Sequence, residues 1–344
     1  MTVLITGGAG YIGSHMALAL RDAGEPAVVL DDLSTGFREA VPEGVPLVVG
    51  DVADEALVLH TLATHQIDTV AHFAARIVVS ESVRDPLGAY AANTCKTRAL
   101  LGALVAADVK RFIFSSTAAV YGLEPPTPTA ETAPCDPASP YGASKLMTER
   151  MLRDVSAAHG LSYVTLRYFN VAGADPQLRS GQRSPGASNL ITLATRASLG
   201  LNDGLQIFGT DLPTADGTGV RDYIHVSDLA DAHVAALRRL RSGGSGGLTL
   251  NCGYGFGYSV REVIAAVGRA AGRELTAVER PRRAGDPYVS IADASRIRER
   301  LGWTPMRDDL DLIVADALRW ERFWWMEKAR RPESSGGAPE PYAV

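Results

Sequence analysis

Short apolar runs alternate with longer amphipathic stretches through the first half of the chain. Runs of this length, apolar at nearly every position, are typical of parallel strands that are covered on both faces. We expect such strands at 3–5, 27–30, 47–49, 69–73, 112–114 and 163–166. The intervening spacing favours helices at 11–24, 54–65, 86–107 and 141–160. This alternation predicts an α/β fold with a doubly wound, Rossmann-type parallel sheet.

The pattern loosens after about residue 170. Polar, Gly- and Pro-rich stretches predict loops at 176–188 and 209–219, helices are expected at 189–199 and 227–241, and short strands at 221–226 and 248–252. We therefore predict a nucleotide-binding Rossmann domain over 1–170, to which 222–250 returns, and a smaller C-terminal α/β substrate lobe over 171–331. Residues 332–344 have little to bury and are expected to be disordered.

Composition excludes several classes of protein. The 344 residues include 34 Lys and Arg against 39 Asp and Glu, a net charge of −5 that argues against a nucleic-acid partner. No apolar run approaches the roughly 18 residues of a membrane-spanning helix, so no membrane partner is expected. Cys95, Cys135 and Cys252 are far apart and show no metal-ligand spacing. This pattern indicates reduced thiols in a cytoplasmic protein, without a metal site.

The first strand runs directly into a glycine-rich turn. Gly7, Gly10 and Gly13 are spaced three apart, and Tyr11 and Ile12 begin the following helix. Such a turn needs glycine because the backbone leaves the strand sharply, approaches a pyrophosphate and packs the helix on the sheet. The helix N-terminus then offers free N–H groups to the phosphates. The strand–turn–helix setting therefore predicts a dinucleotide site.

Acidic residues follow the second and third strands. Asp31 ends the second strand 18 residues after Gly13, where a carboxylate accepts hydrogen bonds from the adenosine ribose. Because Asp31 and the adjacent Asp32 would repel a 2′-phosphate, the sequence favours NAD over NADP. After the third strand, Asp51 and Val52 are candidates for an adenine contact, although Asp51 is equally suited to cap a helix.

A hydroxyl cluster and a tyrosine–lysine pair carry the candidate chemistry. Ser115, Ser116 and Thr117 end a buried strand, where open α/β sheets place their ligands. Downstream, Tyr141 and Lys145 lie one helical turn apart and share a face. A phenol with a pKa of about 10 needs roughly 4 kcal/mol to shift by three units, which an ammonium and a cationic nicotinamide can supply together. After a dinucleotide fingerprint, this spacing predicts a general base.

These motifs resemble the extended short-chain dehydrogenase/reductase family, and within it the UDP-glucose (UDP-galactose) 4-epimerases. The resemblance reaches to about residue 325 and is carried by TGGAGYIGSH (6–15), FSSTAAVYG (114–122), SPYG (139–142), RYFN (167–170) and DGTGVRDYIHV (216–226). It implies an NAD-dependent isomerase that interconverts UDP-galactose and UDP-glucose through a transient 4-keto-hexose. It also implies a homodimer.

The resemblance assigns roles to individual residues of this chain. The base corresponds to Tyr141, the lysine to Lys145, and the hydroxyl partner that contacts the sugar O4 to Thr117. Cofactor contacts are implied for Gly7, Gly10, Tyr11, Ile12, Gly13, Asp31, Asp32, Asp51, Val52, Phe73, Ala74, Ala75, Asn93, Ser115, Tyr141, Lys145 and Tyr168. Substrate contacts are implied for Thr117, Tyr141, Asn170, Asn189, Leu190, Arg221, Arg283, Asp286 and Ser290. Arginine suits a diphosphate because its planar fork donates paired charged hydrogen bonds.

Two departures from the family pattern matter. The segment 74–79 lacks the lysine that many members place near the cofactor, which leaves one cofactor contact unassigned. Ser290 stands where some epimerases carry a bulky tyrosine beside the sugar 2-substituent. A small side chain there leaves room for an N-acetyl group, so we expect activity on UDP-GlcNAc and UDP-GalNAc as well.

Rival functions remain open from the sequence. A nucleotide-sugar dehydratase shares the first hydride step but carries acidic residues after the hydroxyl residue, where this chain has Ala118 and Ala119. A UDP-pentose 4-epimerase is not separated by sequence. A non-catalytic NAD-sensing protein on the same fold usually loses the Tyr–Lys pair, which this chain keeps.

Overall fold

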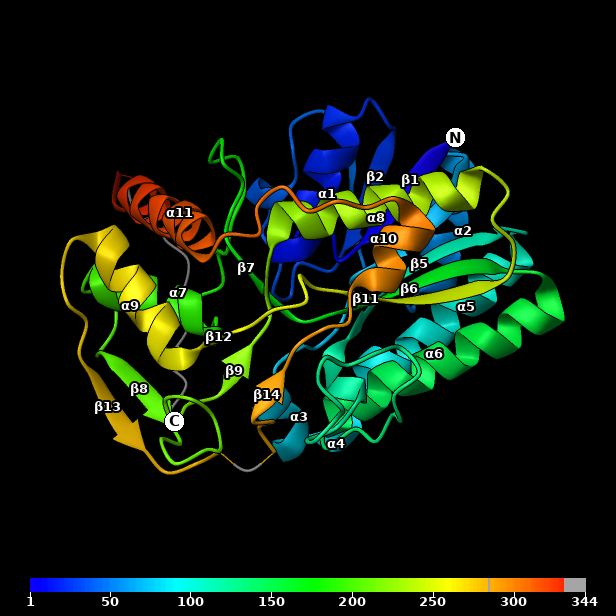
Figure 1. The fold of residues 1–344 in the computed structure, drawn as a ribbon. Coiled ribbons are helices and arrows are strands. Elements are labelled where there is room, and N and C mark those ends of the chain that lie inside the picture. Colours follow the sequence, from blue (N-terminus) through cyan, green and yellow to red (C-terminus); the bar gives the residue numbers. More distant parts are fainter. Residues whose placement is uncertain (284, 331–344) are drawn as a thin grey trace.

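Seven parallel strands form the central sheet of the computed structural model, which describes residues 1–283 and 285–330 (Figure 1). Their order is β11-β6-β5-β4-β1-β2-β3. Their bounds are β1 (Thr2–Thr6), β2 (Ala27–Asp31), β3 (Leu47–Val49), β4 (Ile67–His72), β5 (Arg111–Thr117), β6 (Ser162–Tyr168) and β11 (Gly247–Cys252). All six neighbouring pairs are parallel, which confirms the predicted doubly wound α/β fold.

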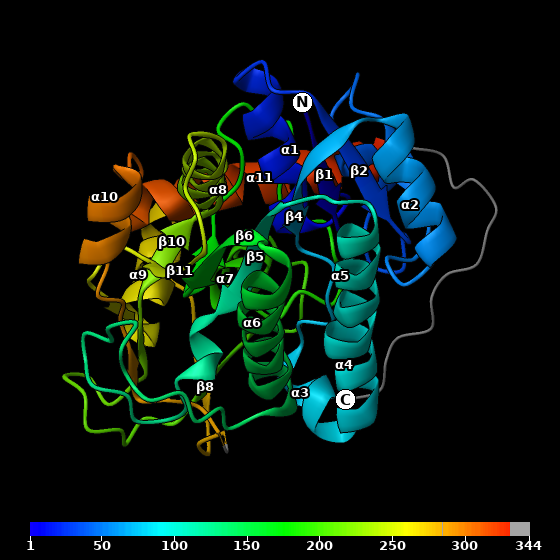
Figure 2. The ribbon, with the colours of Figure 1, turned by 90° about the vertical axis from the view of Figure 1, so that its right-hand side faces the viewer.

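Helices cover both faces of this sheet (Figure 2). On one face α1 (Tyr11–Asp22) packs against α8 (Val226–Arg241), and the other carries α2 (Glu55–Thr64), α5 (Lys96–Ala106) and α6 (Pro140–His159). Every residue of β2 is buried, as its unbroken apolar run predicts. The strand order reverses between β1 and β4, so their carboxyl ends border the crevice in which open α/β sheets bind ligands.

The helix predicted at 86–107 is present but not uniform. It consists of α4 (Pro86–Tyr90), a π-helical turn (Ala91–Cys95) and α5, and α3 (Val79–Arg84) precedes it. The wide turn carries Asn93, whose side chain accepts from the Arg76 N–H at 2.8 Å and donates to the Arg76 carbonyl at 2.9 Å. Such turns are common at functional sites, and this one fixes the segment that follows β4.

A second group of elements lies beside the sheet, at the left of Figure 1. Three mutually packed helices, α7 (Leu190–Ser198), α9 (Val260–Ala271) and α11 (Leu310–Arg330), adjoin the parallel pair β8 (Leu205–Phe208) and β13 (Ala277–Arg280). Two small sheets complete it: β12 (Tyr258–Ser259), β9 (Val220–Arg221) and β14 (Val289–Ser290) form one, and β10 (Tyr223–His225) with β7 (Asn170–Ala172) forms the other. A short helix, α10 (Ser295–Leu301), leads toward α11.

The prediction of one strand over 221–226 is wrong. The chain pairs with β12 and β14 as far as Arg221, passes through Asp222, and then pairs with β7 in a different sheet. A hydrophobic pattern does not reveal such a change of partner, because both short strands are half or fully buried.

The predicted disorder of 332–344 falls outside the described residues. No helix within 1–283 and 285–330 is long and apolar enough to cross a membrane.

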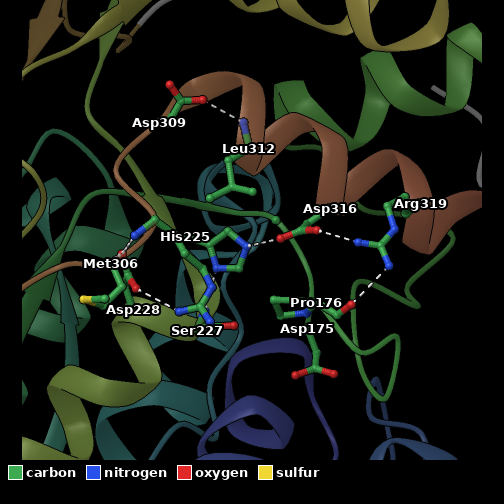
Figure 3. Close-up of polar contacts among 12 residues, drawn as sticks. Asp175, Pro176, His225, Ser227, Asp228, Met306, Asp309, Leu312, Asp316 and Arg319 are labelled. Atoms are coloured by element: carbon green, nitrogen blue, oxygen red, sulfur yellow. Dashed lines mark hydrogen bonds and ion pairs between the residues drawn. The ribbon is translucent and has the colours of Figure 1, made fainter.

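A buried polar contact ties β10 to the C-terminal helix (Figure 3). The Nδ1 atom of His225 accepts from the Ser227 N–H at 3.0 Å, and Nε2 faces the Asp316 carboxylate at 3.4 Å. Asp316 also pairs with Arg319, which donates to the Pro176 carbonyl at 3.2 Å. This contact joins the start of α8, which covers the sheet, to α11.

Candidate active site

The glycine turn brings three segments into close approach. Gly7 has a φ of +69°, and a Cβ placed on it would lie only 2.5 Å from the main-chain nitrogen of Ala74, just after β4. A Cβ on Gly13 would collide with the backbone at Gly7. The turn therefore packs against the end of β4 and against its own helix, which only glycine permits at these two positions.

The same turn leaves the start of α1 available to an anion. Gly10 is the N-cap and provides no side-chain cap, and the first turn contains no acidic residue. The main-chain N–H groups and the positive end of the helix dipole thus point toward the crevice. The Tyr11 hydroxyl donates to the Gly173 carbonyl at 2.7 Å, which fixes the first residue of the helix. The residues present here fit a dinucleotide pyrophosphate.

Asp31 closes the turn from the neighbouring strand. Its Oδ2 accepts from the Ala9 N–H and its Oδ1 from the Leu33 N–H, both at 2.9 Å. Each oxygen keeps a second lone pair for a ribose hydroxyl. Burial raises the pKa of this carboxyl, although the two backbone donors oppose the shift. Asp32 caps its own turn by accepting from the N–H of Ser34 at 2.9 Å.

The helix-cap alternative for Asp51 is wrong, because the N-cap of α2 is Asp54, which accepts from the Leu57 N–H. Asp51 instead pairs with Lys96 at 2.5 Å, and this contact lowers the pKa of the carboxyl although burial acts in the opposite direction. Val52 beside it is buried. Lys96 was not predicted as part of the site, and its only sequence signal is a lysine in the predicted helix 86–107.

The remaining predicted cofactor residues border the same crevice. Phe73, Ala74 and Ala75 follow β4 directly. Ser115 on β5 lies 3.4 Å from Nε2 of His233, whose ring contacts Phe73. Burial raises the pKa of Tyr168 on β6, and a hydrogen bond with Ser115 opposes this. The side chain of Asn93 donates to Ser144 on α6 at 3.0 Å, which links the π-helical turn to the tyrosine-bearing helix.

Three consecutive residues of β5 each engage α6. The Ser115 carbonyl accepts from Nζ of Lys145 at 3.0 Å, Ser116 donates to Glu149 at 2.6 Å, and the Thr117 side chain lies close enough to Tyr141 to favour its phenolate. The carboxyl end of the strand is therefore fixed to one face of the helix. Tyr141 and Thr117 meet at the sheet edge where the sequence places them.

The electrostatics of this pair have two opposing parts. Burial raises the pKa of Tyr141 to about 12, and the hydrogen bond with Thr117 offsets only part of the shift. Burial lowers the pKa of Lys145 to about 8, while Glu149 one turn further along opposes the shift. The chain alone thus keeps the phenol protonated at neutral pH. A bound cation is required to bring the phenol into the range of a working base.

Glu149 is a buried anchor that sequence reasoning missed. It pairs with Arg167 on β6 through two contacts, at 2.9 and 2.5 Å, and both side chains are less than 10% exposed. Ser116 and Arg167 are direct neighbours in the β5–β6 register. The four-residue spacing places Glu149 on the same helix face as Lys145, and this could be predicted from the sequence. Its partner Arg167 could not, because it lies on β6, which only the fold brings close to α6.

The predicted substrate residues lie on the small sheets beside this edge. Arg221 pairs with Asp286 at 3.6 Å and also donates to the Tyr288 carbonyl at 3.4 Å. Ser290 stands opposite Arg221 in the β9–β14 register, and Asn170 begins β7 with its side chain exposed. The structure therefore groups Arg221, Asp286 and Ser290 around one short strand pair.

Two further predicted substrate residues begin α7, and a third, Arg283, contacts an aromatic ring. Asn189 is the N-cap, accepting from the Thr192 N–H at 2.9 Å, and Leu190 is the first helical residue. The exposed guanidinium of Arg283 stacks on Phe208 with 3.7 Å to the ring centroid. Sequence reasoning did not single out Phe208, and its only signal is an aromatic residue just before the Gly209 turn.

Comparison with known proteins decides the family. Residues 3–253 match the family described as NAD dependent epimerase/dehydratase, which is well over half of the chain. The chain belongs to the NAD dependent epimerase/dehydratase family. The family is described as NAD dependent, which confirms the predicted NAD cofactor.

Individual members of this epimerase/dehydratase family resemble the whole chain. A UDP-glucose 4-epimerase of Azospirillum brasilense is 58% identical over 320 residues, 93% of this chain and 92% of that protein. A UDP-glucose 4-epimerase structure from Stenotrophomonas maltophila, with bound NAD and a formylated UDP-arabinopyranose, has a TM-score of 0.91 and 41% identity, covering 96% of this chain and 99% of the other. A UDP-Glc/GlcNAc 4-epimerase from Campylobacter jejuni has a TM-score of 0.81 and 44% identity, covering 94% and 99%.

Proposed function

We infer that this chain is an NAD-dependent isomerase, a 4-epimerase that interconverts UDP-galactose and UDP-glucose through a transient 4-keto-hexose. The observation that carries this is the placement of Thr117, at the carboxyl end of β5, beside Tyr141 and Lys145 on α6, together with a glycine turn that fits a pyrophosphate. Relatives named UDP-glucose 4-epimerase, matching over 90% of the chain, support the same activity. Ala118 and Ala119 leave the dehydratase alternative without its acid.

The chain's own residues divide the work between proton transfer and retention of the nucleotide. The glycine turn and Asp31 would hold NAD, and the bound cofactor would supply hydride-transfer chemistry at C4 of the hexose. Tyr141 Oη removes the O4 proton while Thr117 holds that oxygen, and Tyr141 later gives the proton back. Between these steps the keto sugar turns over while its UDP group stays bound. Arg221, Arg283 and Asp286 are proposed to hold the diphosphate and the uridine ribose.

We assign the two groups of elements accordingly. The seven-stranded sheet with its helices, including α8 and β11 from 222–250, is proposed as the NAD-binding domain. The helices α7, α9 and α11 and the short sheets around β8 and β9 are proposed as the UDP-sugar lobe. The cofactor and substrate residues named from the sequence keep their proposed roles within this division. The three free cysteines suit the reducing cytoplasm, where we expect the enzyme to act.

A homodimer is also proposed. Large apolar side chains are exposed on the neighbouring helices α3, α4 and α6: Val83 is 61% exposed, Leu87 78% and Met147 44%. An apolar surface of this kind fits a second copy of the same chain. Light scattering coupled to size exclusion should give twice the chain mass of 36.5 kDa, and a single-chain mass at micromolar protein would reject the dimer.

One assay tests the proposed reaction. Purified protein is incubated with UDP-galactose without added NAD, and the products are separated by chromatography. We expect UDP-glucose to form until the two sugars reach equilibrium, because the cofactor must stay bound while the hydride is held. Folded, NAD-containing protein that leaves UDP-galactose unchanged would reject the proposal, and a dehydrated product would favour the dehydratase.

A second substrate class is proposed on the strength of one side chain. Ser290 on β14 is small, half-buried and opposite Arg221 in the strand register. The resemblance places it beside the sugar 2-substituent, and the C. jejuni relative is named a UDP-Glc/GlcNAc 4-epimerase. We therefore expect conversion of UDP-GlcNAc to UDP-GalNAc in the same assay. Active enzyme that leaves UDP-GlcNAc unchanged would reject this second activity.

A further inference from the structure

Asp222 is a fully buried carboxylate to which the proposed reaction gives no role. It lies at the junction between β9 and β10, where the chain leaves one small sheet and enters another. Its main-chain N–H donates to the Ser290 carbonyl at 2.9 Å, and its own carbonyl accepts from the Asn170 N–H at 3.0 Å. Since Arg221 precedes it in the chain, one residue is bonded to three segments that carry proposed substrate contacts.

The Asp222 side chain fixes a fourth segment to the same point. Its two carboxylate oxygens accept from the N–H groups of Tyr254 at 2.9 and 3.0 Å, of Gly255 at 2.9 Å and of Ala292 at 3.2 Å. Burial raises the pKa of Asp222 to about 6, against the pull of these donors. These three main-chain N–H donors favour the ionised carboxylate, and hydrogen bonds to an ionised acceptor belong to the stronger class.

These bonds determine how β14 sits against β9. Ala292 follows β14 by two residues, so the carboxylate holds the end of that strand while the main chain of Asp222 holds Ser290 itself. The Arg221 guanidinium donates to the Val220 and Tyr288 carbonyls, one on β9 and the other just before β14. A shift of β14 relative to β9 would therefore move Ser290 and the arginine fork together.

We propose that Asp222 is a positioning residue for the UDP-sugar, which holds Asn170, Arg221 and Ser290 in one frame through its main-chain and carboxylate hydrogen bonds. It touches no reacting atom. The inference rests on the proposed function, because it takes these three residues as the substrate contacts.

Asp228 provides a matched control nearby. It is 1% exposed, and its Oδ2 likewise accepts main-chain N–H groups, from Met306 at 3.1 Å and Arg307 at 2.9 Å (Figure 3). These donors belong to the segment before α11 rather than to β7, β9 or β14, and the third donor to Oδ2 is a side chain, the Tyr254 hydroxyl at 2.8 Å, which the acceptor oxygen of an asparagine can keep. Loss of either carboxylate disturbs a buried cluster, but only that of Asp222 should disturb the proposed UDP-sugar contacts.

The test compares Asp222→Asn and Asp228→Asn in the NAD-containing enzyme. An asparagine keeps the shape but turns an NH₂ group toward main-chain donors, so at least one bond is lost. For Asp222→Asn we expect the KM for UDP-galactose and the Kd for UDP, measured by calorimetry, to rise about 10-fold, as loss of a charged hydrogen bond would give. The kcat at saturating substrate should stay within about 3-fold, since positioning of bound UDP acts on KM.

The two variants also separate positioning from general destabilisation. Asp228→Asn should lower the thermal midpoint yet leave the KM and the UDP affinity at wild-type values. Equal increases in KM for both variants would overturn the proposal, and so would wild-type UDP affinity in Asp222→Asn. Wild-type protein that binds UDP without turnover would reject the epimerase function, while the UDP affinities would still decide the role of Asp222.

Gly253→Ala keeps the proposal testable if Asp222→Asn does not fold. A Cβ on Gly253 would lie 2.6 Å from Oδ2 of Asp222 and 2.8 Å from Cβ of Ala292. It would therefore displace the carboxylate while leaving its charge. We expect weaker UDP binding and a raised KM from this variant too, and unchanged values for both would overturn the proposal.

Discussion

The catalytic edge and the nucleotide-sugar surface of this molecule are built in different ways. At the catalytic edge, Tyr141, Lys145 and Thr117 are each less than 10% exposed and already hydrogen-bonded by the fold. On the sugar surface, Arg283 and Asp286 are exposed, and the Arg221–Asp286 contact is a loose 3.6 Å. The first region is fixed by the chain's own hydrogen bonds, whereas the second presents exposed charged side chains.

The difference follows from the two demands of the proposed reaction. Proton transfer needs atoms fixed within hydrogen-bond reach, so the tyrosine is held by long elements at the centre of the sheet. The sugar must turn over while the nucleotide stays, and the proposed contacts on UDP lie on short strands and a connecting segment. Substitutions in the two regions should therefore affect different kinetic constants.

The largest effect is expected from Tyr141→Phe. Removing the phenol oxygen deletes the proposed base but leaves the ring packed, so kcat should fall about 10³-fold, within the range typical of general acid–base catalysis. The affinity for UDP, measured by calorimetry, should be unchanged. Tyr163→Phe is the matched control. Tyr163 lies near the start of β6, at the end of the strand away from the catalytic edge, so this variant should keep wild-type kcat. Near-normal kcat in Tyr141→Phe would show that another group is the base.

Much of the catalytic edge was predictable from the sequence because it depends on local patterns. The glycine turn, the apolar strand before Thr117 and the four-residue spacing of Tyr141 and Lys145 each lie within a few residues. The order of the elements then places them at one edge of a parallel sheet. The direction of the pKa shift of Tyr141 was not predictable, because it depends on burial, which raises the pKa and outweighs the opposing effect of Thr117.

The sugar surface was less predictable because its contacts join distant segments through very short strands. The break at Asp222 is not revealed by the hydrophobic pattern, because the charged Arg221 and Asp222 separate Val220 from Tyr223 in a stretch too short to show where one strand ends and the next begins. The strands β12, β9, β10 and β14 have only two or three residues each, too few for a period-2 pattern. The substrate residues on this surface were predicted only from the resemblance to a family. The structure then showed which of them lie together.

The next largest effect is expected from Arg221→Ala. Loss of a charged fork on the diphosphate should raise the KM for UDP-galactose about 10- to 100-fold and change kcat much less. Arg269→Ala is the control, because Arg269 on α9 is exposed and pairs with Asp311 rather than with the proposed site. A fall in kcat with unchanged KM in Arg221→Ala would remove the contrast between the two regions.

A smaller, selective effect is expected from Ser290→Tyr. A bulky ring beside the sugar 2-substituent should lower kcat/KM for UDP-GlcNAc at least 10-fold relative to UDP-galactose, through steric exclusion of the N-acetyl group. Ser290→Ala is the control, since it keeps the space and should keep both activities. The two sugar nucleotides are compared in competition with product separation, and an equal loss on both would contradict a role in selecting the sugar.

The smallest effect is expected on the pH dependence of folding stability, at a buried residue close to the catalytic edge. His72 ends β4, is 1% exposed, and its ring nitrogens contact Thr6 at 2.7 Å and Thr97 at 2.8 Å. Burial, and secondarily the Lys145 charge, lowers the pKa of His72 to about 3, below the 6.5 of an unfolded histidine. Between these values only the unfolded chain takes up the proton, so the stabilisation is complete above pH 6.5 and is lost as pH falls.

His72→Asn should remove this pH dependence while keeping polar atoms for the two threonines. The free energy of unfolding, from urea titrations, should therefore differ between wild type and variant by a constant amount above pH 6.5. This difference in the free energy of unfolding should shrink by about 2 kcal/mol by pH 5, because the wild type loses about 1.36 kcal/mol of stability per pH unit below pH 6.5. Parallel stability curves from pH 7 to pH 5 would show that His72 does not stay neutral inside the fold. The catalytic edge would then contain a second positive charge beside Lys145, which is inconsistent with an edge fixed by neutral, buried hydrogen bonds.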